Sequence, residues 1–251
     1  MLAGCASAPA ARPVALPAAP SPVVSAEQTP EQLAASAATN CRLLAAPAER
    51  TWGLAAARAA HARAPAARAA ALALARCAHL AADLEKDEAR VIALAEEGMT
   101  VLAQAHLPPG DAEAAYLHAL NLGLFVRSRG MTAVGRLGDL VALLKVAGEK
   151  PALDQGGPLR VLGLLYVKAP SWPLGPGDLE AAIELLERAA RDYPEHPLNH
   201  LYLAYALLDA GERERAREEI GRARELCTAQ RFGEWAAHWR DEIEQLLARA
   251  R

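Results

Sequence analysis

The chain has 251 residues, enough for one large or two small domains, and a formal net charge of −3 with both signs mixed along it. It shows no sustained basic stripe, which argues against nucleic-acid binding. No stretch of 18 residues lacks both charge and Pro, so we expect no membrane-spanning helix. Apolar residues make up 53% and aromatic residues 4% of the chain. Abundant Ala and Leu with few β-branched residues predict a nearly all-helical fold.

The first five residues, Met1-Leu2-Ala3-Gly4-Cys5, match the end of a bacterial lipoprotein signal, in which the Cys is acylated. The stretch that follows is rich in Ala, Pro and Ser and lacks periodicity, which predicts a flexible tether. No basic region and no apolar region precede Leu2, so we infer that the sequence begins inside the real signal peptide. We therefore predict a lipid on Cys5, a tether over 1–30 and a helical domain over 31–251, located in the periplasm. A chance match is the alternative, because Ala, Gly and Leu are common here.

From Pro30 onward, Pro and Gly residues divide the chain into amphipathic segments with helical periodicity. We predict helices near 31–46, 50–63, 65–82, 84–106, 111–128, 131–147, 157–169, 178–193, 198–210, 212–228 and 231–250.

The cysteines leave two alternatives open. Cys41 and Cys77 lie on predicted helices about one repeat length apart, and an oxidising periplasm would permit a disulfide between them. Spacing alone does not show that their Cα atoms come close enough. Three buried free thiols, with Cys227 as the third, are the other interpretation. No C-x-x-C or Cys/His spacing predicts a zinc site.

Glycines are frequent in the segments around 121–138, at Gly123, Gly130, Gly135 and Gly138. Each interior Gly costs a helix about 1 kcal/mol relative to Ala. We expect close helix packing to account for them, with a nearby ligand as the less favoured alternative.

The clearest pattern is a 34-residue self-match near the C-terminus. Four residues recur at this spacing: Gly177, Ala182, Leu186 and Ala189 return as Gly211, Ala216, Ile220 and Ala223. The period, with small residues at fixed positions, is typical of tetratricopeptide (TPR) helical hairpins. Such a hairpin buries its apolar face only by stacking on its neighbours. The predicted fold is therefore all-α, a TPR-like α-solenoid of stacked antiparallel helical hairpins, and the predicted function is binding.

Local residues support this prediction. Asp178 is placed to cap the helix that begins there, and an apolar stripe follows it at helical spacing. Pro194 ends that helix, and Pro197 suits the first turn of the next one.

One hairpin of the array is irregular. Leu162 to Tyr166 match the L-G-x-x-Y pattern of a first TPR helix, but Gly177 follows Tyr166 by eleven residues where a regular repeat has four. Seven extra residues therefore lie within KAPSWPLGPG, and long ordered loops on helical scaffolds are often functional. We predict partner or ligand contacts at Lys168, Pro170 and Trp172 in this segment and at Asn199 and Tyr202 on the following helix.

Evidence for catalysis is sparse. The chain has no nucleophile elbow, phosphate-binding loop, dinucleotide fingerprint or H-E-x-x-H motif, so we predict no catalytic residue and no cofactor. His196 and His200 are four residues apart, but Pro197 intervenes and no Cys or carboxylate cluster is near, so we predict no metal site. Trp235 and Trp239 are interpreted as the apolar cap of the last helix, with a functional aromatic patch as the less favoured alternative.

The segment 156–210 resembles the T component associated with TRAP transporters, a family of TPR-like periplasmic lipoproteins. The shared features are G-G-x-x-R-x-L-G at 156–163, K-A-P-x-W-P at 168–173, Gly177-Asp178, and the pair Pro197 and Asn199.

The resemblance implies a non-catalytic helical protein that meets the membrane only through its lipid. It also implies association with the periplasmic solute-binding protein of a TRAP system, assembly as a homo-oligomer and delivery of a hydrophobic small molecule. A general envelope TPR scaffold is the alternative function. That scaffold would bind a peptide or another envelope protein on its concave face, through residues such as Asn199 and Tyr202, and would not need the loop.

Overall fold

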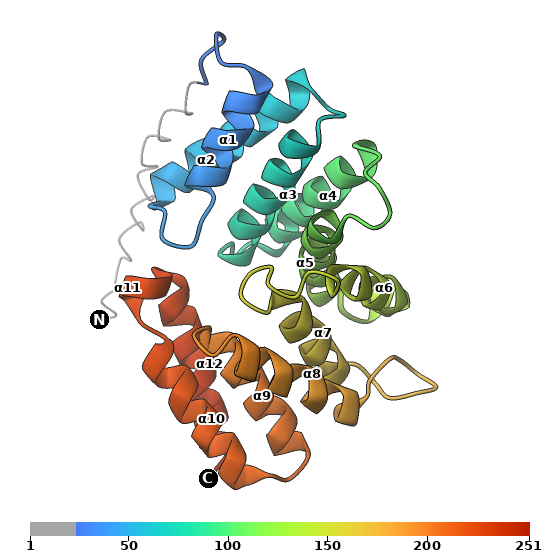
Figure 1. Ribbon diagram of the computed structural model, residues 1–251, viewed down its shortest axis with the longest axis vertical. Coiled ribbons are helices and arrows are strands. Elements are labelled where there is room, and N and C mark those ends of the chain that lie inside the picture. Colours follow the sequence, from blue (N-terminus) through green and yellow to red (C-terminus); the bar gives the residue numbers. More distant parts are fainter. Residues whose placement is uncertain (1–23) are drawn as a thin grey trace, which may run out of the picture.

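The structure is a computed structural model, which describes residues 24–251 (Figure 1). Cys5 and most of the predicted tether lie outside the described residues. The elements are α1 (Pro30–Asn40), α2 (Pro47–Arg63), α3 (Arg68–Asp83), α4 (Glu88–Gln104), α5 (Ala112–Arg129), the 3₁₀ segment η1 (Gly130–Arg136), α6 (Leu137–Ala147), α7 (Gly157–Lys168), α8 (Leu179–Asp192), α9 (Pro197–Asp209), α10 (Arg213–Leu226), α11 (Ala229–Phe232) and α12 (Trp235–Arg249).

Consecutive helices pack as hairpins, and the hairpins stack side by side along a curved path (Figure 1). The first helices of successive hairpins also pack together, α1 with α3, α3 with α5, and α7 with α9. The path curves so far that α11 comes to lie beside the N-terminal hairpin. The described chain is an all-α solenoid, as the sequence predicts.

Several helix boundaries differ from the predictions. The helix predicted over 31–46 ends at Asn40, because the chain leaves helical geometry at Cys41, with ψ of 74°. The segment predicted as 131–147 begins as the 3₁₀ turn η1 and becomes α-helical only at Leu137. The helix predicted over 231–250 is two helices, because Gly233 adopts a φ of +57° between α11 and α12.

The local features predicted around α8 and α9, namely a capping residue, an apolar stripe and a proline in the first turn, are confirmed. The Asp178 carboxylate accepts a hydrogen bond from the Ala181 amide at 3.0 Å, which caps α8. Ala182, Leu186 and Ala189 are buried along one stripe of this helix, and Pro197 lies in the first turn of α9.

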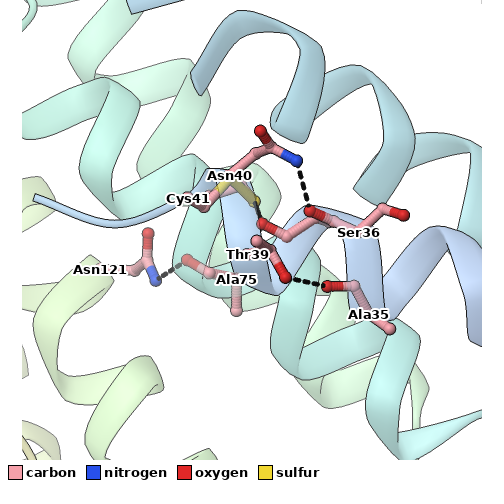
Figure 2. The surroundings of a disulfide bond; sticks show 9 residues. Ala35, Ser36, Thr39, Asn40, Cys41, Ala75 and Asn121 are labelled. Carbon is pink, nitrogen blue, oxygen red and sulfur yellow. Dashed lines mark hydrogen bonds between the residues drawn. A yellow bond between two sulfur atoms is a disulfide. The ribbon is translucent and has the colours of Figure 1, made fainter. Parts of the chain in front are cut away.

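The N-terminal hairpins pack through small residues, chiefly the alanines of α2 and α3. A disulfide joins Cys41, at the end of α1, to Cys77 in α3, with the two Cα atoms 5.2 Å apart (Figure 2). Gly53 of α2 packs directly on this bond, because a Cβ there would lie 2.7 Å from the Cys41 sulfur. Cys227 stays a buried thiol.

A buried amide joins α3, α4 and α5 beside the disulfide. Asn121 is fully buried and donates a hydrogen bond to the carbonyl of Ala75 (Figure 2). It donates a second one to the carbonyl of Leu117. Gly98 of α4 makes room for it, because a Cβ there would lie 2.4 Å from Asn121 Oδ1. The prediction that Gly123 and its neighbours in sequence mark close packing is wrong for Gly123, Gly135 and Gly138, which have open space where a Cβ would point.

Within residues 24–251, no helix combines the length and the apolar character needed to cross a membrane.

Candidate functional site

The irregular hairpin carries an ordered loop between α7 and α8. Its stem is closed by two backbone hydrogen bonds, from Gly177 N to Pro170 O at 2.8 Å and from Asp178 N to Tyr166 O at 3.2 Å. A turn at the tip adds a bond from Leu174 N to Ser171 O at 3.0 Å. The loop therefore has a defined backbone and projects outward beyond α7 and α8 (Figure 1).

Glycines allow the two chain segments of the loop stem to approach each other. A Cβ on Gly177 would lie 2.2 Å from the Ala169 carbonyl oxygen, and one on Gly175 would lie 2.7 Å from that of Pro170. Real Cβ atoms do not come so close to backbone oxygens, so a larger residue at either position would force the stem apart. These glycines and the intervening prolines restrict the loop to one shape before any partner binds.

The tip of this loop presents two large apolar side chains to solvent. Trp172 is 86% exposed and Leu174 is 79% exposed. Among the described residues only one other large apolar side chain, Leu44, is comparably exposed, at 55%. Trp is among the residues that most often dominate the binding energy of protein interfaces, and a preorganised backbone lowers the cost of binding. The sequence pattern did not predict Leu174 as a contact residue, because the resemblance that pointed to Trp172 covers the chain only to Pro173 in this segment.

The other residues predicted in this segment lie at its base. Pro170 is exposed and its carbonyl forms the stem. The Lys168 ammonium lies 3.9 Å from the centroid of the Tyr205 ring, a cation–π contact that ties the base of the loop to α9.

Asn199 is not available to a partner, which corrects the prediction made for it. It is fully buried, and its Oδ1 accepts a hydrogen bond from Arg160 Nη1 at 2.8 Å. Its Nδ2 donates to the carbonyls of Gln155, Ala189 and Tyr193. A side chain that satisfies this many backbone and guanidinium groups has a structural role.

Asp154 completes the network around Arg160. Its Oδ2 lies 2.5 Å from Arg160 Nη2 and accepts the Tyr116 hydroxyl at 2.9 Å. Burial acts to raise the pKa of Asp154, but the Arg160 guanidinium, aided by the Tyr116 hydroxyl, outweighs it and holds the pKa below its usual value. The backbone turns sharply here, with left-handed φ angles at Asp154, Gln155 and Gly156. The G-G-x-x-R motif of the sequence is therefore a structural joint, in which Arg160 binds the connection between α6 and α7.

Tyr202 lies on α9 and is half-buried. Burial raises the pKa of its hydroxyl, and the charges that act on it include Asp83 of α3 and Arg160 of α7. Burial likewise lowers the pKa of His79, while the carboxylates of Asp83 and Asp154 oppose that shift. Burial is therefore the main cause of the pKa shifts of both Tyr202 and His79.

The two histidines of α9 are engaged separately. His196 caps α9 through Nδ1, which accepts the Leu198 amide at 3.3 Å, and its ring packs against Phe232 and Trp239. His200 has Nδ1 at 2.6 Å from Glu219 Oε2 and Nε2 at 2.7 Å from the Pro194 carbonyl. Within residues 24–251, no three His, Cys, Asp or Glu side chains are grouped to hold a metal ion. Trp235 and Trp239 are both buried, in agreement with the interpretation of an apolar cap.

A groove of about 700 Å³ lies between α2 and α4, over the end of α3. The sequence predicted no site in this region. Leu54, Leu80, Leu84 and Leu94 are among its apolar lining residues. Arg58 crosses it to form a two-bond pair with Glu97, with both nitrogen–oxygen distances at 2.7 Å. Charged side chains line it as well, among them Arg50, Glu85 and Arg90. No sequence motif predicts this groove, because its lining residues come from three helices that lack a recognisable repeat pattern.

The sequence of the chain was compared with models of known protein families. The family model for a tetratricopeptide repeat matches residues 174–226, from the tip of the loop to the end of α10. The fold is a TPR-like α-solenoid. The matched region contains the α9–α10 hairpin together with α8, the part in which the 34-residue period is regular. A comparison with curated proteins finds no match to the chain. TPR-like domains are generally non-catalytic scaffolds that bind other proteins, and this chain has that architecture.

Proposed function

We propose that this TPR-like protein is a non-catalytic periplasmic lipoprotein that serves a TRAP-type uptake system by binding its solute-binding protein. The observation that carries the proposal is the ordered loop that presents Trp172 and Leu174 to solvent. Exposing two large apolar side chains is unfavourable by about 1.5–3 kcal/mol each relative to burying them. A partner that covers the tip recovers that free energy, and the preformed backbone adds no ordering penalty.

Direct binding measurements test this proposal. A purified candidate solute-binding protein would be titrated against the chain by calorimetry, and Trp172→Ala should weaken binding at least thirtyfold if the indole is a central anchor. Leu174→Ala should weaken it less, because it removes less apolar area. Leu44→Ala is the matched control, since it removes another exposed Leu from a different part of the surface.

The general envelope scaffold remains the second candidate function. It is favoured by Tyr202, a half-buried aromatic residue on α9, within the residues that the tetratricopeptide repeat model matches. Binding lost on Tyr202→Ala and retained on Trp172→Ala would select this candidate over the first. A substitution at Asn199 is not suitable for this binding test, because it would disturb the fold.

The proposed hydrophobic solute would occupy the groove between α2 and α4. Its leucine lining offers an apolar surface, and its Arg58–Glu97 pair marks one polar boundary. Leu94→Lys would place an ammonium in the groove and should abolish binding of an apolar fluorescent probe, whereas Leu44→Lys should not. Equal probe binding by both variants would remove the groove from the proposal.

A further inference from the structure

The two ends of the solenoid meet through side chains. Trp235 at the start of α12 donates its indole N–H to Asp83 Oδ2 at the end of α3, at 2.8 Å. Arg50 in the first turn of α2 pairs with Glu234 and lies 5.0 Å from the centroid of the Trp235 ring. These contacts span about 150 to 180 residues of sequence, whereas an open repeat array makes contacts only between neighbours. The described part of the solenoid is therefore closed into a ring.

On the opposite side of the ring, different interactions hold the helices together. There, α5, α6 and α7 share a continuous apolar core that includes Leu140, Leu144 and Leu162. The Asp154–Arg160–Asn199 network reinforces the same joint with hydrogen bonds that are buried at Asn199 and part-buried at Asp154. Buried apolar area and satisfied buried polar groups make this joint stable.

The contact at Trp235 between the two ends of the solenoid lacks most of this buried apolar area and buried hydrogen bonding. Within residues 24–251, α11 and α12 form no extensive helix–helix packing with α2 or α3, in contrast to the consecutive helices of the array. Leu43, Leu80 and Leu84 reach the C-terminal core only as partly buried neighbours. The Glu234 side chain is half exposed, so its pair with Arg50 contributes little. The buried indole and its bond to Asp83 therefore dominate this joint.

We propose that the Trp235–Asp83 contact is a clasp that holds the two ends of the solenoid together and opens ahead of the rest of the fold. Regions with few buried apolar contacts open at the lowest free energy. Within the described residues, the helices on the two sides of this joint lack the packing that joins consecutive helices. Opening separates residues 41–50 from 229–236. This inference is independent of the partner proposed for the loop.

Hydrogen exchange measured by mass spectrometry on the full chain tests the clasp, using Asp83→Ala and Asp83→Asn as a matched pair. The alanine removes the acceptor of the indole N–H, whereas the asparagine keeps an oxygen acceptor of similar size. Asp83→Ala should speed exchange about tenfold in both 41–50 and 229–236, the effect of losing one buried hydrogen bond to a carboxylate. Neither segment contains the substitution. Asp83→Asn should stay near the wild type, and exchange in α5 should not change in either variant.

Two further variants keep the test decisive. Arg50→Gln should speed exchange in 229–236, the segment that excludes the substitution, by a smaller factor, and it leaves Asp83 and Trp235 intact if Asp83→Ala folds poorly. Trp239→Phe disturbs the C-terminal core without touching the clasp, so it should leave 41–50 unchanged. The proposal is overturned if Asp83→Ala and Asp83→Asn behave alike, if only one of the two segments responds, or if every helix exchanges faster together.

Discussion

The two halves of the ring share one architecture but are stabilised by different means. In α1–α5 the core is built largely from alanines, and a disulfide and the Asn121–Gly98 contact lie within it. In α7–α12 the core contains larger side chains such as Trp235 and Leu201, with a buried hydrogen-bond network at its edge. Alanines allow helices to approach closely but each buries little apolar surface, so a covalent cross-link adds stability where packing alone adds least. The larger side chains of the second half bury more surface each.

Removing the disulfide is the strongest test of this comparison. For cysteines separated by 36 positions, the chain-entropy relation gives a loss of about 4 kcal/mol in the free energy of unfolding when Cys41 and Cys77 are both changed to Ala. Urea denaturation measures it, and a reductant should produce the same loss in the wild type. Cys227→Ala is the control, because that thiol is not cross-linked. Equal midpoints with and without reductant would show that the N-terminal half does not depend on the bond.

Asn199→Ala should lower the free energy of unfolding by about 3 kcal/mol, because it removes four hydrogen bonds from a buried site, one from Arg160 and three to backbone carbonyls. Asn121→Ala is the matched variant in the other half. It should cost less, since Asn121 makes two hydrogen bonds and its Oδ1 has no partner. Denaturation of both variants in one buffer gives the comparison, and an equal or larger loss at Asn121 would contradict it.

The buried His196 makes the C-terminal half sensitive to acid. Burial, aided by the Arg160 charge, lowers the pKa of His196 to about 3. The unfolded chain therefore binds a proton near pH 6.5 that the folded chain does not bind, and stability falls as the pH falls between these values. Between pH 7 and pH 5 this residue should account for a loss of about 2 kcal/mol.

His196→Gln should reduce that loss by the same amount, as measured by urea denaturation at the two pH values. His79 and His118, whose pKa values burial also lowers, keep a residual slope in the variant. An unchanged pH dependence would show that His196 is protonated in the folded protein.

Trp172→Ala should have the smallest effect on the fold, less than about 0.5 kcal/mol, because the indole contributes little to any core. Thermal unfolding measures it alongside the binding experiment. A large destabilisation would mean that the indole supports the loop itself, and a loss of binding could then not be assigned to direct contact.

The sequence predicted the fold class and much of the helix order well. The period of the apolar positions, Asp178 as a cap and Pro197 at a helix start are local features, and local features determine where helices form. The extra residues before Gly177 also predicted the loop. Asn199 was predicted wrongly because a polar residue on a predicted concave face is exposed or buried according to what packs over it, here Arg160 and the turn at Gln155.

The sequence by itself determined that this protein is a stack of helical hairpins with one irregular member, since periodicity, caps and turn residues act over a few positions. Only the tertiary structure decided that Cys41 meets Cys77, that Leu174 joins Trp172 at the loop tip and that Trp235 closes a ring on Asp83. The physical reason lies in the solenoid. Small rotations between successive hairpins accumulate along the array, and their sum determines which distant residues meet.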